Sequence, residues 1–180
     1  MIRFLGFLCL LFLFSFSNDE QPKRLAWESD RKLQWSDFEA PADDLLPYAA
    51  TANSGMSHSY AITDNGEFLR STSEVKAHFY PEFSWYKSKD TTAVILAHEQ
   101  SHFDITEIHA RKFRKRIEEF EFTTNAAVEV RELYDLTENE RMQMQNRFDK
   151  ESQHSLNAEA ELFWKNQIAR LLEKLDYYAE

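Results

Sequence analysis

Hydrophobic and polar residues follow different periods in the two halves of the chain. In the first half, short stretches alternate apolar and polar residues, which is typical of half-buried strands. The triplet Asp64-Asn65-Gly66 predicts a tight hairpin turn between two of them, because Asn and Gly accept positive φ angles. We therefore expect a small antiparallel sheet. Its predicted strands cover residues 32–38, 49–62, 67–69 and 74–80.

The second half repeats apolar residues every three or four positions and contains neither Gly nor Pro after Pro81, which predicts nearly continuous helix. Three helices are expected in this half, and packing them on the sheet buries all their apolar stripes, so the predicted fold class is α+β. The expected helices cover residues 91–120, capped by Asp90 or Ser88, then a segment from Thr124 or Asn125 to Arg147, then a segment after Asn157.

A metal-binding pattern lies on the inward stripe of the first predicted helix. His98 and His102 are four residues apart, so on a helix they project from one face, about one turn apart. Two imidazoles and the carboxylate of Glu99 are costly to bury unless a cation compensates them. This His-Glu-x-x-His arrangement suits two ligands to one zinc ion, with Glu99 as general base, as on the motif helix of zincin-like peptidases.

A catalytic zinc ion needs a third protein ligand. His109 shares the stripe with the motif, but seven residues beyond His102 correspond to about 10 Å along a helix, which excludes it. Asp104 and Glu107 lie about half a turn from the ligand face and stay open as alternatives. His154 falls at the junction of the second and third predicted helices, where a side chain can turn back toward the first helix.

An extended pattern around these residues resembles a bacterial family of unknown function described as predicted secreted zinc-dependent proteases. Its first part is His98-Glu99-Gln100-Ser101-His102-Phe103-Asp104-Ile105-Thr106-Glu107-Ile108, and its second part is Phe148-Asp149 with Glu151-Ser152-Gln153-His154. Earlier pieces are also similar, namely residues 33–38, 50–52 and 84–85. The chain departs from the family pattern at three positions, where Ser101, Ser152 and Ser155 stand in place of Gly, Thr and Gly.

The resemblance implies a zinc-dependent metallopeptidase. It makes His98, His102 and His154 ligands of Zn²⁺ and Glu99 the general base that activates water against a peptide bond. Residues 18–180 would form one metallopeptidase-like domain, with a sheet half at 18–86 and a helical half at 87–180. The alternative is a non-catalytic envelope binding protein with a structural metal site. Substrate specificity and the oxyanion-stabilising residue stay open.

The N-terminus and the charge indicate where such a protein would act. Residues 1–17 combine Arg3 with an apolar run and are expected to be a signal peptide, with an uncleaved anchor as the alternative. Cleavage would leave a secreted or periplasmic protein without a membrane span. The net charge of -10 argues against nucleic acid as a partner, and the basic run 111–116 is interpreted as a solvated helix face. The expected partner is a peptide or protein substrate, and the oligomeric state stays open.

Overall fold

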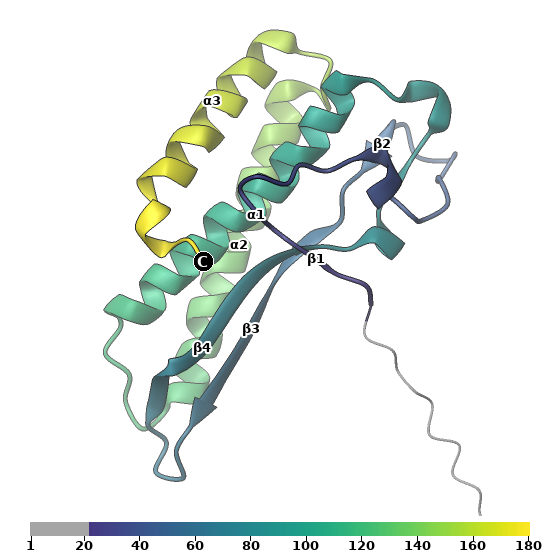
Figure 1. Cartoon of the computed structure of the whole chain (residues 1–180). Coiled ribbons are helices and arrows are strands. Elements are labelled where there is room, and N and C mark those ends of the chain that lie inside the picture. The colour runs from purple at the N-terminus through teal and green to yellow at the C-terminus, as the bar shows by residue number, and fades with distance from the viewer. Residues whose placement is uncertain (1–21) are drawn as a thin grey trace, which may run out of the picture.

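The computed structural model describes residues 22–180, in which three long helices lie beside a long β-hairpin (Figure 1). The predicted signal peptide at 1–17 falls outside these residues. Antiparallel strands and three C-terminal helices confirm the α+β prediction. The strands are β1 (Leu25–Ala26), β2 (Ala50–Thr51), β3 (Ser54–Ile62), β4 (Phe68–Phe79) and β5 (Trp85–Tyr86), and the helices are α1 (Ala93–Glu119), α2 (Ala126–Ser152) and α3 (Ala158–Lys174).

The strands form two antiparallel sheets. The larger has the order β1-β4-β3, and the smaller pairs β2 with β5. The hairpin between β3 and β4 turns where the sequence predicts it, with a hydrogen bond of 2.9 Å from the Gly66 amide to the Thr63 carbonyl. Gly66 has a φ of 85°, and a Cβ atom there would lie 2.3 Å from the carbonyl oxygen of Thr124. Glycine is therefore required at this turn.

The strand predicted at 32–38 is wrong, because this segment is a loop that ends in a short 3-10 helix, Trp35–Asp37. Side chains take the backbone hydrogen bonds that a neighbouring strand would have taken. The Asp37 carboxylate accepts from the Gln34 amide at 2.8 Å, and the Gln100 side chain accepts from the Leu33 amide at 2.7 Å. Leu33 and Phe38 are nonetheless buried and Trp35 is partly buried, so the alternation identified residues that face the core, although the segment pairs with no strand of residues 22–180.

Two other strand predictions have wrong boundaries. The segment 49–62 is broken between β2 and β3, because the Tyr80 amide bonds the Asn53 carbonyl and the Ser84 hydroxyl bonds the Asn53 amide. The segments 67–69 and 74–80 merge into the single strand β4. The hairpin has one irregularity in its register, between Ser59 and Ala61.

The helices occur where they were predicted, with shifted ends. The N-cap of α1 is Thr92, whose hydroxyl accepts from the Ile95 amide at 3.2 Å, in place of the predicted Asp90 or Ser88. Helix α2 continues beyond Arg147 to Ser152. Asn157 caps α3 as predicted, since its side chain accepts from the Ala160 amide at 3.2 Å.

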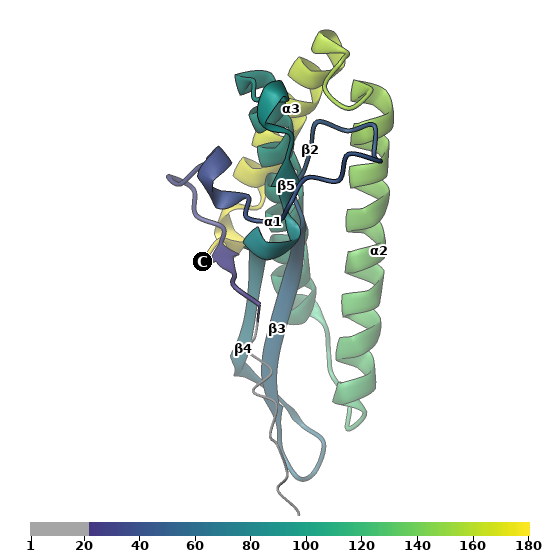
Figure 2. The same cartoon turned by 90° about the vertical axis from the view of Figure 1, so that its right-hand side faces the viewer.

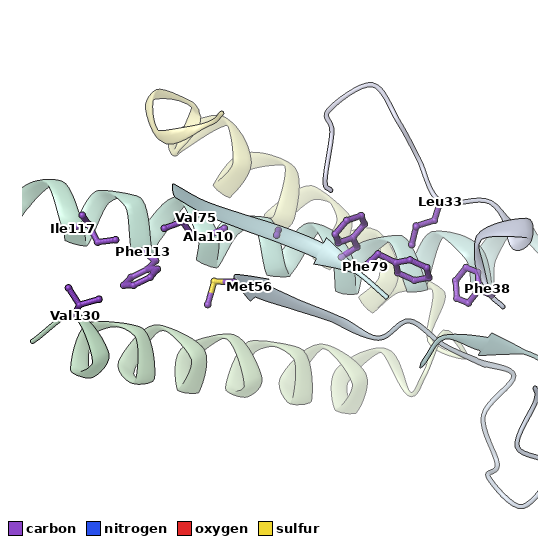
Figure 3. Packing of buried hydrophobic residues seen from close by; sticks show 11 residues of the cluster. Leu33, Phe38, Met56, Val75, Phe79, Ala110, Phe113, Ile117 and Val130 are labelled. Atoms are coloured by element: carbon purple, nitrogen blue, oxygen red, sulfur yellow. The ribbon is translucent and has the colours of Figure 1, made fainter. Parts of the chain in front are cut away.

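Helix α1 is the central element, because it contacts the sheet on one side and both other helices on the other (Figure 1). Against the sheet, Ala110 and Phe113 of α1 pack with Val75 and Phe79 of β4 (Figure 3). Phe103 of α1 belongs to the same cluster, with its ring centroid 5.9 Å from that of Phe79. A second cluster joins α1 to the other helices and contains Ile105, Ile108, Phe148, Trp164, Ile168 and Leu175. With apolar contacts on both sides, α1 is held rigidly, and so are the side chains that it carries. Across residues 22–180, every helix is too short or too polar to cross a membrane.

His109 belongs to this core. Its Nδ1–H donates to the Ile105 carbonyl at 2.8 Å, and its Nε2 accepts from the Lys112 amine at 3.2 Å, so both ring nitrogens are used by a neutral imidazole. Burial lowers the pKa of His109 to about 4, although its bond to the Ile105 carbonyl acts in the opposite direction. The ring is therefore structural, as its distance from the motif predicted.

We expect His109 to make folding stability depend on pH. The unfolded chain binds a proton at this ring below pH 6.5, whereas the folded chain does so only near pH 4, so stability falls as the pH drops through this interval. Between pH 7 and pH 4 the loss amounts to about 3 kcal/mol. Urea titrations of the wild type and of His109→Gln at both pH values measure it, and equal losses in the two proteins would contradict the assignment.

Candidate metal centre

The motif lies in the first turns of α1, on a buried face. His98 and Glu99 are each 4% exposed and His102 is 9% exposed. Phe148 of α2 fixes both imidazoles, since its ring stacks on His98 with centroids 4.5 Å apart and meets the edge of His102 at 5.2 Å. Neither histidine can leave the site without opening the contact between α1 and α2.

Helix α2 brings a carboxylate to the two histidines. The Asp149 Oδ1 atom lies 3.2 Å from His98 Nε2 and 2.8 Å from His102 Nε2, and the two Nε2 atoms are 3.3 Å apart. These three atoms form a compact triangle of the types that bind metal ions in proteins. The group of His98, His102 and Asp149 could therefore hold a metal ion.

The triangle has the size that a tetrahedral site requires. With bonds of about 2.0–2.1 Å, neighbouring ligand atoms of tetrahedral zinc are about 3.3 Å apart, and the three separations here are 3.3, 3.2 and 2.8 Å. Asp149 Oδ1 is buried and, within residues 22–180, receives no hydrogen bond of good geometry. A buried carboxylate oxygen without such a bond is costly unless a cation compensates it, so the residues fit a divalent metal ion.

A second carboxylate orients the first ligand. His98 turns its Nδ1 atom to Glu161 of α3, whose Oε1 lies 2.7 Å away, and this leaves Nε2 to face the triangle. Burial lowers the pKa of His98, but the carboxylates of Asp149 and Glu161 outweigh it and raise that pKa to about 9. For Asp149, burial acts to raise the pKa of the carboxyl, but the imidazoles of His102 and His98 outweigh it, so the pKa of Asp149 lies well below its ordinary value. The surroundings thus favour positive charge between these side chains.

Removing this support should weaken metal binding without unfolding the protein. We expect Glu161→Ala to lower zinc affinity by about 10- to 100-fold, because His98 loses the partner that fixes its ring and its tautomer. Competition with a fluorescent zinc chelator measures the change. Glu159→Ala is the matched control, since Glu159 is an exposed carboxylate one half-turn away on α3. Equal affinity in both variants would show that Glu161 does not support the site.

Glu99 lies beside the triangle. Its Oε2 atom accepts a hydrogen bond of 2.6 Å from the Ala52 amide, directly after β2. Burial raises the pKa of the Glu99 carboxyl above its ordinary value, although the imidazoles of His102 and His98 and the Ala52 amide act in the opposite direction. A carboxylate with a raised pKa is a better proton acceptor near neutral pH, as general-base catalysis requires.

These side chains share one pocket of about 230 Å³. The three candidate ligands and Glu99 line it, together with residues 48–52, which include β2. Figure 2 shows β2 and β5 next to the N-terminal part of α1. The pocket gives a small molecule or a chain segment direct access to the metal group and to the carboxylate of Glu99.

The structure places His154 at the rim of this pocket, and not in the triangle. Its side chain is 47% exposed, its Nδ1 atom lies 3.7 Å from Asp149 Oδ1, and its ring packs on Tyr48 with centroids 4.6 Å apart. It lies in the α2–α3 junction, as predicted, where residues 153–155 all have positive φ. Three successive non-glycine residues in this region are strained, which is typical of positions held for function.

Neither open alternative for the third ligand lies near the histidines' ligand atoms. Asp104 accepts from Trp27 Nε1 at 2.7 Å and from Gln100 at 2.8 Å. Glu107 is buried and pairs with Arg111 and Arg114 on the side of α1 that faces the C-terminal residues. Both carboxylates stabilise the packing of α1.

Sequence reasoning assigned no role to Asp149 or Glu161. Asp149 stood inside the second part of the family-like pattern, and that was the signal that could have identified it. The sequence offered no such signal for Glu161. It lies in the first turn of a predicted helix, where acidic residues are common because they stabilise the positive end of the helix dipole.

Comparison with known protein families gives a match over more than half of the chain. The family model described as "Bacterial protein of unknown function (DUF922)" matches residues 48–155, a range that begins at Tyr48 in the pocket wall and ends directly after His154. Searches of curated proteins and of solved structures found no match.

Proposed function

This chain belongs to the DUF922 family of bacterial proteins of unknown function, and we propose that it is a zinc-dependent peptidase. In this proposal His98, His102 and Asp149 hold the zinc ion, Glu99 is the general base, and a peptide or protein is the substrate. The predicted signal peptide at 1–17 would send the enzyme to the periplasm or out of the cell.

One observation carries the proposal: three ligand atoms and a buried carboxylate share a pocket. A structural zinc site is closed by four protein ligands, whereas a catalytic site has three and keeps one position open. Here three protein atoms form the triangle, and the pocket that contains them also contains Glu99. The arrangement supports metal-assisted hydrolysis better than a purely structural ion.

Each residue of the site has a separate role in the proposed hydrolysis. A zinc ion in the triangle would supply Lewis acidity to a water molecule and to a substrate carbonyl. Glu99 accepts a proton from the water as the water oxygen adds to the carbonyl carbon, and it returns a proton to the amine nitrogen as the C–N bond breaks. Asp149 and Glu161 balance the positive charge, and Phe148 and Glu161 keep His98 in place.

The test uses mature protein, freed of metal and then loaded with one equivalent of zinc. Unfolded casein is the probe, and new amino termini are detected by mass spectrometry. We expect cleavage with zinc, none after treatment with a chelator, and recovery when zinc is added back. Stoichiometric zinc binding without any new terminus would favour the alternative, a binding protein with a structural metal.

A further inference from the structure

Gln145 joins α2 to α1 beside the candidate metal centre. Its side-chain nitrogen Nε2 donates to the backbone carbonyl of His102 at 3.2 Å and to the hydroxyl oxygen of Thr106, also at 3.2 Å. Gln145 is half-buried and lines the pocket of the site, yet it is neither one of the three candidate ligands nor the general base. Its two bonds connect it to the helix that carries the motif.

The hydrogen bonds around Thr106 fix the orientation of the Gln145 amide. The hydroxyl of Thr106 has one proton, which it donates to the His102 carbonyl at 3.1 Å, so its lone pairs accept from Gln145 and from the Ser54 hydroxyl, whose oxygen lies 2.8 Å away. A carbonyl oxygen can only accept, so Gln145 has to turn its NH₂ group, and not its oxygen, toward α1. The hydroxyl of the fully buried Thr106 is thereby satisfied.

The same face of α2 carries a candidate metal ligand one turn later. Asp149 follows Gln145 by four residues, so the two side chains project from one face of the helix. Gln145 bonds the backbone of His102, and Asp149 Oδ1 lies 2.8 Å from the imidazole Nε2 of that same residue. Two neighbouring turns of α2 therefore contact one residue of α1, the first through its backbone and the second through its ring.

Apolar packing alone would leave the sliding of α2 along α1 loosely determined, because contacts between apolar surfaces are not directional. A slide by one residue moves a helix by about 1.5 Å, whereas metal–ligand distances vary by only about 0.2 Å. Arg116 of α1 also bonds two side chains of α2, Thr137 and Glu140. Both lie nine or more residues before Asp149. The bonds of Gln145 act one turn from that ligand, where the required precision is greatest.

We propose that Gln145 is a positioning residue, which holds the turn of α2 that carries Asp149 at the level of His102. This inference rests on the metal site of the proposed function, and it does not require peptide hydrolysis. Gln145 does not bind the ion in this proposal. It acts on zinc affinity through Asp149, by keeping the triangle at the size that a metal ion needs.

Gln145→Met tests the role, because methionine has nearly the length of glutamine and no N–H donor. We expect zinc affinity to fall by about 10- to 100-fold, the range for residues that orient a metal ligand. Competition with a fluorescent zinc chelator measures the change. The matched control is Gln143→Met, since Gln143 is exposed on the same helix and bonds Asn139 at 3.3 Å. The control should bind zinc like the wild type, and equal affinity in Gln145→Met would overturn the proposal.

A double-mutant cycle separates positioning from a general loss of structure. If Gln145 acts through Asp149, Gln145→Met should change zinc affinity by less than about 3-fold once Asp149→Ala is present. A loss of about 10-fold that persists in Asp149→Ala would mean that Gln145 supports the fold or the ring of His102. That result would contradict the role through Asp149.

A second variant covers the case in which Gln145→Met does not fold. Gln145→Asn keeps the polar amide and withdraws it from α1 by one methylene group, so the amide no longer reaches the His102 carbonyl. It should lose zinc affinity in the same range and show the same coupling to Asp149→Ala. Wild-type affinity in Gln145→Asn would overturn the proposal.

The outcomes distinguish this role from the proposed function. Coupling between Gln145 and Asp149 in a protein that binds zinc and cleaves no casein would support the positioning role and overturn the peptidase. Casein cleavage by the wild type, together with unaltered zinc affinity in both Gln145 variants, would leave the peptidase standing and overturn the positioning role.

Discussion

Asp149→Ala should lower zinc affinity by more than about 100-fold, beyond the loss expected for an orienting residue such as Glu161. Asp149 Oδ1 is one corner of the triangle, at 3.2 and 2.8 Å from the two imidazole nitrogens. Without it, two protein ligands are left, one fewer than a catalytic zinc site has. Equilibrium dialysis with metal analysis, or competition with a chelator, measures the change.

The matched comparison is His154→Ala, because the family resemblance made His154 the third ligand. With Nδ1 at 3.7 Å from Asp149 and a side chain packed on Tyr48, His154 lies at the rim of the pocket. We expect its loss to change zinc affinity by less than about 3-fold, as for a residue outside the coordination sphere. If His154→Ala loses zinc and Asp149→Ala retains it, the ligand assignment has to be reversed.

Asp149 shows what the sequence could not provide. The spacing of His98 and His102 is local, so one helix period is enough to place both imidazoles on one face. Asp149 is 47 residues beyond His102, at the far end of another helix, and its position depends on how α2 packs against α1. Periodicity identifies the apolar stripe of each helix. It does not specify which turn of α2 packs against which turn of α1.

The elements of the fold that were predicted correctly are likewise those that depend on residues close together in the sequence. The helices followed from their period and from caps such as Asn157, and the hairpin turn followed from Gly66, since each of these signals acts within a few residues. The loop at 32–38 resembled a strand because its apolar residues alternate. In the structure the Leu33 amide donates to the side chain of Gln100, which lies far away in the sequence, so no local pattern could have indicated this contact.

Glu99→Gln should abolish hydrolysis while zinc still binds. A general base contributes about 10²- to 10⁴-fold, so turnover should fall by that factor once the carboxylate cannot accept a proton. The amide oxygen of Gln can still accept the bond from the Ala52 amide, which keeps the wall of the pocket in place.

Stability separates this loss from unfolding. Burial raises the pKa of Glu99, so the ionised carboxylate is disfavoured in the folded, metal-free chain, and a neutral amide of the same shape removes that cost. We therefore expect the metal-free variant to be as stable as the wild type or more stable. Its zinc affinity should be unchanged, and its zinc-loaded form should not cleave casein.

Full casein cleavage by zinc-loaded Glu99→Gln would rule out Glu99 as the general base. A loss of zinc affinity would mean that Glu99 supports the ligands and not the reaction. Stability, zinc affinity and turnover therefore have to be measured on one preparation, because only the combination of stable fold, bound zinc and absent cleavage assigns proton transfer to this residue.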